Sequence, residues 1–414
     1  MSMSETNKTQ VLVVGAGLAG LSAAVTLQEA GVEVRLVEGS SKVGGRLKTT
    51  KRDGFILDHG FQVFNPAYPN SKQLLDYSTL NLRKFSPGVK IVSETGSTVL
   101  GNPLLDLSFA LPLLRRPDQF LDLAKFGFYC ASLIGSSEPN IFDTDAKTAL
   151  VQAHLSDEFI EKTMRPFLSG VFLEPDLKSS RRFMDFVLKY FLKGTPSVPA
   201  HGMAAIAEQL ASKLPADAIL LDTWAHGIDG TNVKTDFATL EAEHVIVATD
   251  QDTTAAWLGI ESRGWRSVTT WYHTTDIARE HLAGGKALLH VDSDRRGPIV
   301  NTVPISHAAA SYAPPGKHLI STSTLDLDTS TAREYEVKAQ LAKIYGIDTS
   351  DFQTVDLFAI EKALPISNVP LIQLADIEVR PNVYVASDTF TTPSINGAME
   401  SGQMAANAII AKIR

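Results

Sequence analysis

The chain has 414 residues, of which 44% are hydrophobic and 20% are charged, and its formal net charge is -8. This length accommodates two globular domains with substantial cores. No basic tract stands out, so we expect no nucleic-acid partner, because phosphate binding requires clustered Lys and Arg side chains. Cys130 is the only cysteine, which excludes an intrachain disulfide framework and a thiolate metal cluster.

The membrane-related signals in the sequence are weak. The first ten residues are polar, and the apolar run at 11–14 is too short for a signal peptide. No stretch reaches the roughly 20 apolar residues that a membrane span requires. The most apolar segment, 103–135, is interrupted by charges, and we expect it to form helices packed in a substrate domain. A membrane-surface contact through this segment is the less favoured alternative, and we expect a cytoplasmic protein.

The first elements along the chain predict the start of a parallel βαβ unit. Residues 10–14 form a short apolar strand, residues 18–30 carry apolar side chains at helical spacing, and residues 33–37 form a second strand. Two further apolar strands come much later, at 244–248 and 383–386, and a helix rich in small residues begins near Gly397. The domain built from these strands should therefore be discontinuous in sequence.

The segments between these strands predict a second domain. Residues 141–165, 178–193 and 334–345 are expected to be helical, and residues 266–325 contain short strands typical of an antiparallel sheet. We therefore expect an α/β chain, in which a discontinuous Rossmann-like cofactor domain is joined to an α+β substrate domain with an antiparallel sheet. The expected boundaries are 1–80, 200–255 and 356–414 for the cofactor domain, and 81–199 and 256–355 for the substrate domain.

A glycine motif of the GxGxxG type follows the first strand and begins the first helix. Gly15 permits the tight turn, Gly17 lets the backbone approach a pyrophosphate, and Gly20 lets the helix lie close to the sheet. The helix N-terminus then offers free N–H groups to the phosphates. Glu38 ends the second strand roughly 20 residues further on, where a carboxylate binds both ribose hydroxyls. This pattern predicts a dinucleotide site.

The residues after Glu38 distinguish an FAD site from an NAD site. Glu38 begins the segment EGSSKVGGR, which ends with Gly44, Gly45 and Arg46. It resembles the ExxxxxGGR signature of the superfamily that holds flavin amine oxidases, protoporphyrinogen oxidases and carotenoid desaturases. Two glycines let the backbone approach the cofactor, and Arg46 supplies a permanent cation for the FAD pyrophosphate. The resemblance implies FAD as the cofactor.

Three further segments extend the resemblance over most of the chain. FILDHGF at 55–61 resembles the DxG element beside the flavin ring, and HGM at 201–203 with the strand 219–222 resembles the GGM element and its adenine-side strand. Residues 383–402 resemble the terminal GD…GAxxSG element, whose acid binds the ribitol or the pyrophosphate. Ser387 departs from the usual glycine there, and this change could alter the local backbone.

The resemblance implies a set of cofactor-binding residues. They are Gly15, Gly17, Leu18, Ala19, Gly20, Glu38, Gly44, Gly45, Arg46, His59, Gly60, Phe61, Ala225, Asp388, Ala398 and Met399. For His59 we favour a packing role over the alternatives of covalent attachment or a base. The sequence assigns no catalytic residue, and its histidine spacing offers no metal site.

Two departures separate the chain from amine oxidases. The stretch 265–274 lacks their lysine, and Ser394 stands where their tyrosine is expected. The segment 165–172 resembles the desaturase and protoporphyrinogen-oxidase branch instead. We therefore expect an FAD-dependent oxidoreductase that removes hydride from a small apolar substrate and passes electrons to an unidentified acceptor. The alternatives are a flavin amine oxidase, a non-redox flavin-dependent isomerase, and an FAD-binding protein without turnover.

Overall fold

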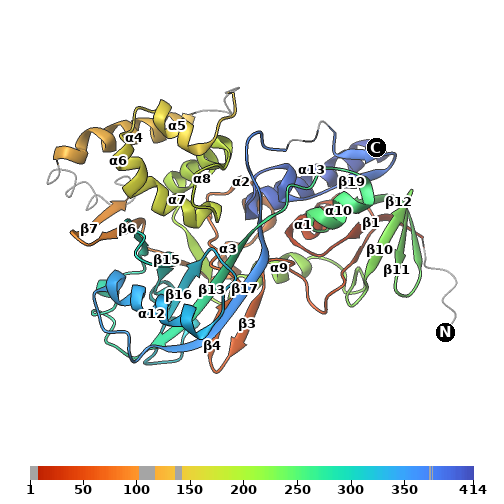
Figure 1. Cartoon of the computed structure of the whole chain (residues 1–414). Coiled ribbons are helices and arrows are strands. Elements are labelled where there is room, and N and C mark those ends of the chain that lie inside the picture. The colour runs from red at the N-terminus through yellow and green to blue at the C-terminus, as the bar shows by residue number, and fades with distance from the viewer. Residues whose placement is uncertain (1–7, 102–116, 136–141, 373, 375) are drawn as a thin grey trace.

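Two large sheets and a cluster of helices organise the protein. The structure is a computed structural model and describes residues 8–101, 117–135, 142–372, 374 and 376–414. Figure 1 shows the first sheet beside the second, with the helices α4 to α8 gathered over one end of the second sheet. The fold is mixed α/β, as the sequence predicts.

The first sheet is built from strands that lie far apart in the chain. β1 (Lys8–Val14) lies between β2 (Val34–Val37) and β12 (Thr239–Val247), and all three are parallel. The next parallel neighbours are β9 (Ile219–Leu220) beside β2 and β19 (Val383–Val385) beside β12. This arrangement confirms the prediction of a parallel sheet whose strands come from distant parts of the chain. Two shorter antiparallel additions complete it: the hairpin of β10 (Ala225–Asp229) and β11 (Asn232–Thr235), and β18 (Glu378–Arg380).

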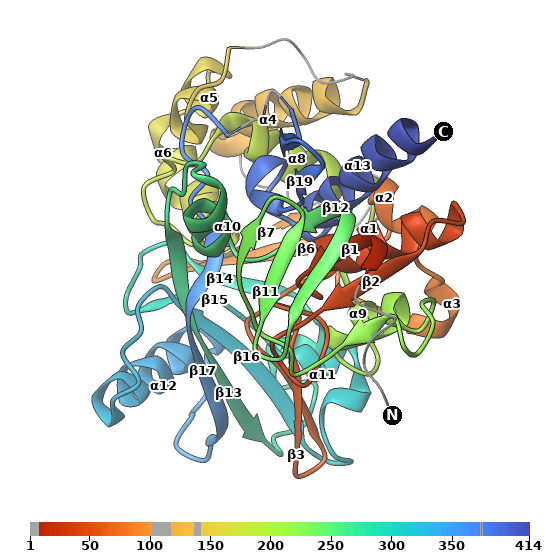
Figure 2. The same ribbon diagram turned by 90° about the vertical axis from the view of Figure 1, so that its right-hand side faces the viewer.

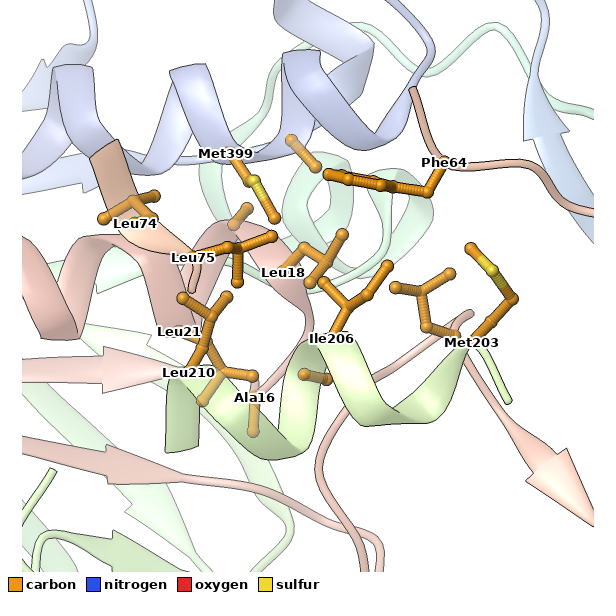
Figure 3. Packing of buried hydrophobic residues seen from close by; sticks show 14 of the residues in the cluster. Ala16, Leu18, Leu21, Phe64, Leu74, Leu75, Met203, Ile206, Leu210 and Met399 are labelled. Carbon is orange, nitrogen blue, oxygen red and sulfur yellow. The ribbon is translucent and has the colours of Figure 1, made fainter. Parts of the chain in front are cut away.

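Side chains alternate across this sheet, as the period of a strand requires. Val11 and Val13 of β1 join the core formed with α1 (Leu18–Glu29), α9 (Ala204–Ala211) and α13 (Ile395–Ile413). Leu12 and Val14 join a separate cluster on the other face. Figure 3 shows the first core from close by. Leu18 of α1, Ile206 of α9 and Met399 of α13 lie in the same hydrophobic cluster. Each fully buried side chain of this kind stabilises the fold by roughly 1.5–3 kcal/mol.

The second sheet has seven strands in the order β17-β13-β16-β15-β14-β6-β7. They are β6 (Gly88–Ser93), β7 (Gly96–Gly101), β13 (Trp265–Thr275), β14 (Leu289–Asp292), β15 (Ile299–Val303), β16 (His318–Thr324) and β17 (Gln353–Pro365). Neighbouring strands are antiparallel except for β14 and β6. The predicted strands within 266–325 are confirmed. Sequence analysis missed β6, β7 and β17.

One predicted domain boundary falls inside a strand. β17 runs from Gln353 to Pro365 and pairs with β13, so it crosses the boundary placed between residues 355 and 356. We propose that the cofactor domain resumes after residue 365, and the other boundaries stay as predicted. The helix α12 (Thr331–Tyr345) covers the face of this sheet on which Trp271 is buried.

The helical cluster has its own core. It contains α4 (Pro117–Gly135), α5 (Ala146–Gln152), α6 (Asp157–Phe159), a π-helix η3 (Ile160–Met164), α7 (Arg165–Phe172) and α8 (Arg181–Lys193). The helices predicted within 141–165 and 178–193 are confirmed. Of the predicted apolar segment 103–135, residues 103–116 lie outside the described residues. Among the residues that are described, no helix combines the length and apolar character needed to span a bilayer.

Short elements join these layers. β3 (Thr49–Arg52) and β4 (Phe55–Asp58) form a hairpin, and β5 (Leu82–Lys84) pairs with β8 (Ser197–Pro199). The short helices are α2 (Pro69–Leu74), α3 (Tyr77–Leu80), α10 (Gln251–Leu258) and α11 (Ile305–Ala308). Figure 2 shows the strands β10 to β12 in front of the second sheet, with α10 beside them.

The contact between α1 and α13 depends on the absence of a side chain at Gly402. A Cβ atom there would lie 2.1 Å from the carbonyl oxygen of Ala19. We expect Gly402→Ala to lower the free energy of unfolding by about 1–3 kcal/mol, which is typical of overpacking. Thermal unfolding of the FAD-loaded protein measures this change.

Gly127 on α4 provides the matched control, because a Cβ atom there would meet nothing within 4 Å. Gly127→Ala makes the same replacement in a helix and should raise stability by up to about 1 kcal/mol through helix propensity. Equal melting temperatures for the two variants would contradict the proposed close approach of the helices.

Candidate functional site

A cavity of about 1700 Å³ lies where the first sheet, the second sheet and the helical cluster meet. Val14 and Val37 at the ends of β1 and β2 line it, as do Ala248 and Ala386, which follow β12 and β19. The cavity therefore lies outside the carboxyl ends of the parallel strands, where open α/β sheets bind their ligands.

Most of the residues predicted to bind the cofactor line this cavity. They are Gly15, Gly17, Leu18, Ala19, Glu38, Gly44, Gly45, Arg46, His59, Gly60, Phe61, Ala225, Asp388 and Ala398. The structure does not bring Gly20 and Met399 to its surface. Gly20 lies against the carbonyl group of Gly15, and Met399 is fully buried in the core shown in Figure 3.

The glycine motifs build a concave backbone surface. Gly15 has φ 105°, and a Cβ atom there would lie 2.6 Å from the carbonyl oxygen of Ala248, so this turn requires glycine. Gly17 and Gly44 form a parallel bridge, and the Gly44 N–H donates to the Ala16 carbonyl over 2.8 Å. No side chain caps α1 at Gly17. The first N–H groups of α1 therefore remain available, and this backbone fits a pyrophosphate.

Glu38 is held in place by the same backbone. One carboxylate oxygen accepts the Ala16 N–H at 2.8 Å. The other accepts the N–H of Ser40 at 2.9 Å and its hydroxyl at 2.6 Å. A carboxylate has about four acceptor sites, so Glu38 can accept further hydrogen bonds from two ribose hydroxyls. The geometry fits the role predicted for it.

Arg46 and Asp388 meet in the cavity although they are 342 positions apart in sequence. Arg46 Nη2 lies 2.5 Å from Asp388 Oδ1, and its guanidinium group lies 5.4 Å from the centre of the Trp265 ring. The Asp388 side chain is only 4% exposed. The preceding Ser387 has φ -160°, which any residue adopts, so the substitution of the usual glycine leaves the backbone undistorted.

The side chain of His59 is occupied by packing. Its ring stacks on Phe358 with 4.0 Å between ring centres, and Nε2 lies 2.9 Å from the Thr50 hydroxyl. Burial lowers the pKa of the imidazole, so the ring is neutral at pH 7. These contacts favour the packing role over covalent attachment or a base.

Two further residues that line the cavity have polar partners of their own. Lys362 lines the cavity, where its Nζ lies 2.7 Å from Asp252 and 3.2 Å from Asp250. The hydrogen bond to Asp252 raises the pKa of Lys362, so the amine is charged. Ser394 also lines the cavity and caps α13 by accepting the Gly397 N–H.

The rest of the cavity has mainly apolar walls, whose individual residues sequence analysis did not name. They come mainly from the helical cluster and include Phe126, Phe159, Phe167, Phe183, Phe186 and Phe191. The density of phenylalanines over 159–191 was the available signal, but their convergence depends on tertiary packing. The described residues contain no group of three or more His, Cys, Asp and Glu side chains placed to hold a metal ion.

The cofactor contacts predict the effect of two substitutions on FAD affinity. Glu38→Ala removes an acceptor for ribose hydroxyls, and Arg46→Ala removes a cation from the pyrophosphate site. Each contact is typically worth about 1.5–3 kcal/mol, so titration of the apoprotein should show FAD affinity falling about ten- to a hundredfold per change. Arg52→Ala is the control, because Arg52 pairs with Asp356 and does not line the cavity. Wild-type affinity in both test variants would exclude these roles.

The packing of His59 predicts that FAD is bound without a covalent link through this ring. The purified protein should be yellow, and acid precipitation should release intact FAD into the supernatant, where its absorption spectrum identifies it. Flavin that remains with the precipitate in the wild type, but not in His59→Ala, would show attachment through His59.

Comparisons with known proteins identify the family of the chain. A family model described as flavin containing amine oxidoreductase matches residues 18–410. The 4,4'-diapolycopene oxygenase of Methylomonas sp. is 36% identical over 153 residues, which are 34% of this chain and 29% of that protein. Protoporphyrinogen oxidase 2 of Arabidopsis thaliana is 26% identical over 166 residues, 39% of this chain and 32% of that protein. The matches thus span about a third of the length of these curated relatives.

A solved structure extends the likeness to the whole fold. The crystal structure of an oxidoreductase from Methanosarcina mazei has a TM-score of 0.73 and 17% identity, with 97% of this chain and 100% of that chain covered. This likeness concerns the fold alone. Because the family match spans residues 18–410, the chain belongs to the flavin containing amine oxidoreductase family, as its motifs predict.

Proposed function

We propose that the chain is a dehydrogenase or desaturase that oxidises a small, apolar organic substrate. Bound FAD supplies the hydride acceptor, its N5 atom, and an external electron acceptor completes each turnover. The observation that carries the proposal is the wall of phenylalanine side chains on the helical side of the cavity. We place the protein in the cytoplasm.

The size of the cavity supports a site shared by cofactor and substrate. Ligand sites commonly measure roughly 300–1,000 Å³, and this cavity of about 1700 Å³ has room for two molecules. Burial of hydrocarbon against the apolar walls contributes roughly 25 cal/mol per Å² of area removed from water. Two relatives are named for diapolycopene and protoporphyrinogen, and these names favour an apolar organic substrate.

In this proposal the polar residues bind the cofactor and the apolar ones orient the substrate. Glu38 would bind the adenosine ribose, the backbone at Ala225 would contact the adenine, and Arg46 and Asp388 would bind the pyrophosphate and the ribitol. The phenylalanine walls exclude water and hold the reacting carbon near the cofactor, since transfer requires the reacting atoms within roughly 3–3.5 Å.

The amine-oxidase alternative has weaker support from the cavity. An ammonium substrate requires a carboxylate or an aromatic face to replace its water. Asp250 lines the cavity but already pairs with Lys362, and the aromatic walls around the substrate side are formed by phenylalanines in close mutual packing. An apolar molecule needs no such compensation.

Anaerobic reduction of the bound flavin tests the proposal directly. Polyene and hydrophobic ring compounds should bleach the flavin absorption faster than primary amines do. Rapid bleaching by a simple amine, with none by apolar compounds, would restore the amine-oxidase alternative. Product formed without any electron acceptor would instead indicate the isomerase, and flavin that no compound reduces would indicate a protein without turnover.

A pair of phenylalanine substitutions separates the cavity wall from general effects on the protein. Phe191→Ala removes a ring from the wall and should lower the second-order rate of flavin reduction about tenfold or more, because burial of an aromatic side chain is worth roughly 1.5–3 kcal/mol. Phe237→Ala is the matched control, because Phe237 is 74% exposed and does not line the cavity. Equal rates in the two variants would contradict a substrate site at this wall.

A further inference from the structure

One polar side chain lies among the apolar walls of the cavity without a partner. Asn301 belongs to β15, lines the cavity and is only 4% exposed. The neighbouring helix α7 contributes the apolar residues Phe167 and Val171 to the same cavity. A buried amide in such surroundings normally has hydrogen-bond partners.

The backbone on both sides is shaped to admit this amide. The register of β15 against β16 shifts between Ile299 and Asn301, and such bulges re-aim side chains near functional sites. On the adjacent helix α7, a Cβ atom at Gly170 would lie 2.3 Å from Asn301 Nδ2. Glycine at this position therefore makes the space that the amide occupies.

None of the described residues satisfies the amide. Asn301 Oδ1 is buried without a hydrogen-bond partner, and its Nδ2 forms no hydrogen bond with the described part of the chain. Asn65, which also lines the cavity, shows the usual behaviour. Its Nδ2 donates to the Tyr190 carbonyl over 2.7 Å, and its Oδ1 accepts the Ala67 N–H over 2.9 Å.

We propose that Asn301 is a substrate-binding residue that hydrogen-bonds one neutral oxygen, a hydroxyl or carbonyl group, on an otherwise apolar substrate. This inference rests on the proposed function, in which an apolar molecule fills the cavity. An unpaired buried amide is costly, and a ligand that supplies the missing partner removes this cost. Ser323, the cross-strand neighbour of Asn301, also lines the cavity and adds a hydroxyl group beside the amide.

The neutral character of the bound group follows from the immediate neighbours of Asn301, which are the uncharged Ser323 on β16 and Gly170 on α7. A single amide does not replace the water shell of a carboxylate or an ammonium group, whose burial requires an opposite charge. A hydroxyl or carbonyl oxygen loses far less on burial and can be satisfied by one donor and one acceptor. Asn301 therefore selects substrates with one neutral oxygen over pure hydrocarbons.

Binding of matched ligand pairs to the oxidised FAD-loaded protein tests this selection. The pairs are retinol with axerophtene, the hydrocarbon that lacks its hydroxyl, and 2-naphthol with naphthalene. Dissociation constants come from the change in the flavin absorption spectrum. The wild type should prefer the oxygenated member of a pair by about tenfold or more, and Asn301→Leu should lose this preference. Val171→Leu, which changes only apolar volume in the same wall, should keep it.

The outcomes separate this inference from the proposed function. If the wild type binds neither member of either pair, the apolar-substrate proposal fails and the assignment of Asn301 fails with it. If the ligands bind but wild type and Asn301→Leu show the same ratio of affinities, only the role of Asn301 is overturned.

Thermal unfolding distinguishes a substrate-binding role of Asn301 from a structural one, because the two roles predict opposite changes in the melting temperature of Asn301→Leu. Asn301→Leu removes an unpaired polar group, so its melting temperature should equal or exceed that of the wild type. Asn65→Leu breaks two hydrogen bonds and should unfold at a lower temperature. A loss of stability in Asn301→Leu as large as that in Asn65→Leu would assign Asn301 to the fold and overturn the proposal.

Discussion

The buried carboxylate of Asp58 is the interaction on which the position of the site depends. It accepts hydrogen bonds from the Thr49 hydroxyl at 2.6 Å, the Met203 N–H at 2.8 Å and the Tyr312 hydroxyl at 2.7 Å. Its backbone carbonyl accepts the Tyr272 hydroxyl at 2.8 Å. Burial raises the pKa of this carboxyl group, and the three donors oppose that shift. One residue thus connects the β3–β4 hairpin, the start of α9 and the second sheet.

This connection matters because Gly60 and Phe61, two residues that line the cavity, follow Asp58 two and three positions later in the chain. The two sheets come from interleaved segments, so no single stretch of sequence holds them in register. Asp58 does so through hydrogen bonds inside a protein core, where a lost partner is expensive. The resemblance of residues 55–61 to the DxG element suggested a place beside the flavin. In the structure the Asp58 side chain instead forms hydrogen bonds to three segments that surround the site.

The features predicted from sequence are those that depend on local backbone geometry. Gly15, Glu38 and Arg46 could be identified because a turn, a strand end and a glycine pair constrain nearby residues only. The strand β17, the particular phenylalanines that line the cavity and the Asn301 amide were not identified, because each depends on partners far away in the chain. The orientation of His59 also needed the structure, since it is fixed by Phe358, which sequence analysis did not connect to it.

The distribution of polar groups in the cavity explains how one space can receive two different molecules. Beside the parallel sheet, Glu38, Arg46 and Asp388 offer charges that are held by exchangeable hydrogen bonds and ion pairs, which suits a charged dinucleotide. On the helical side the phenylalanine rings offer no hydrogen bonds, so a charged group placed against these rings would lose its water without compensation. Electrostatics therefore directs each molecule to its own half, and the continuity of the cavity lets their reacting atoms meet.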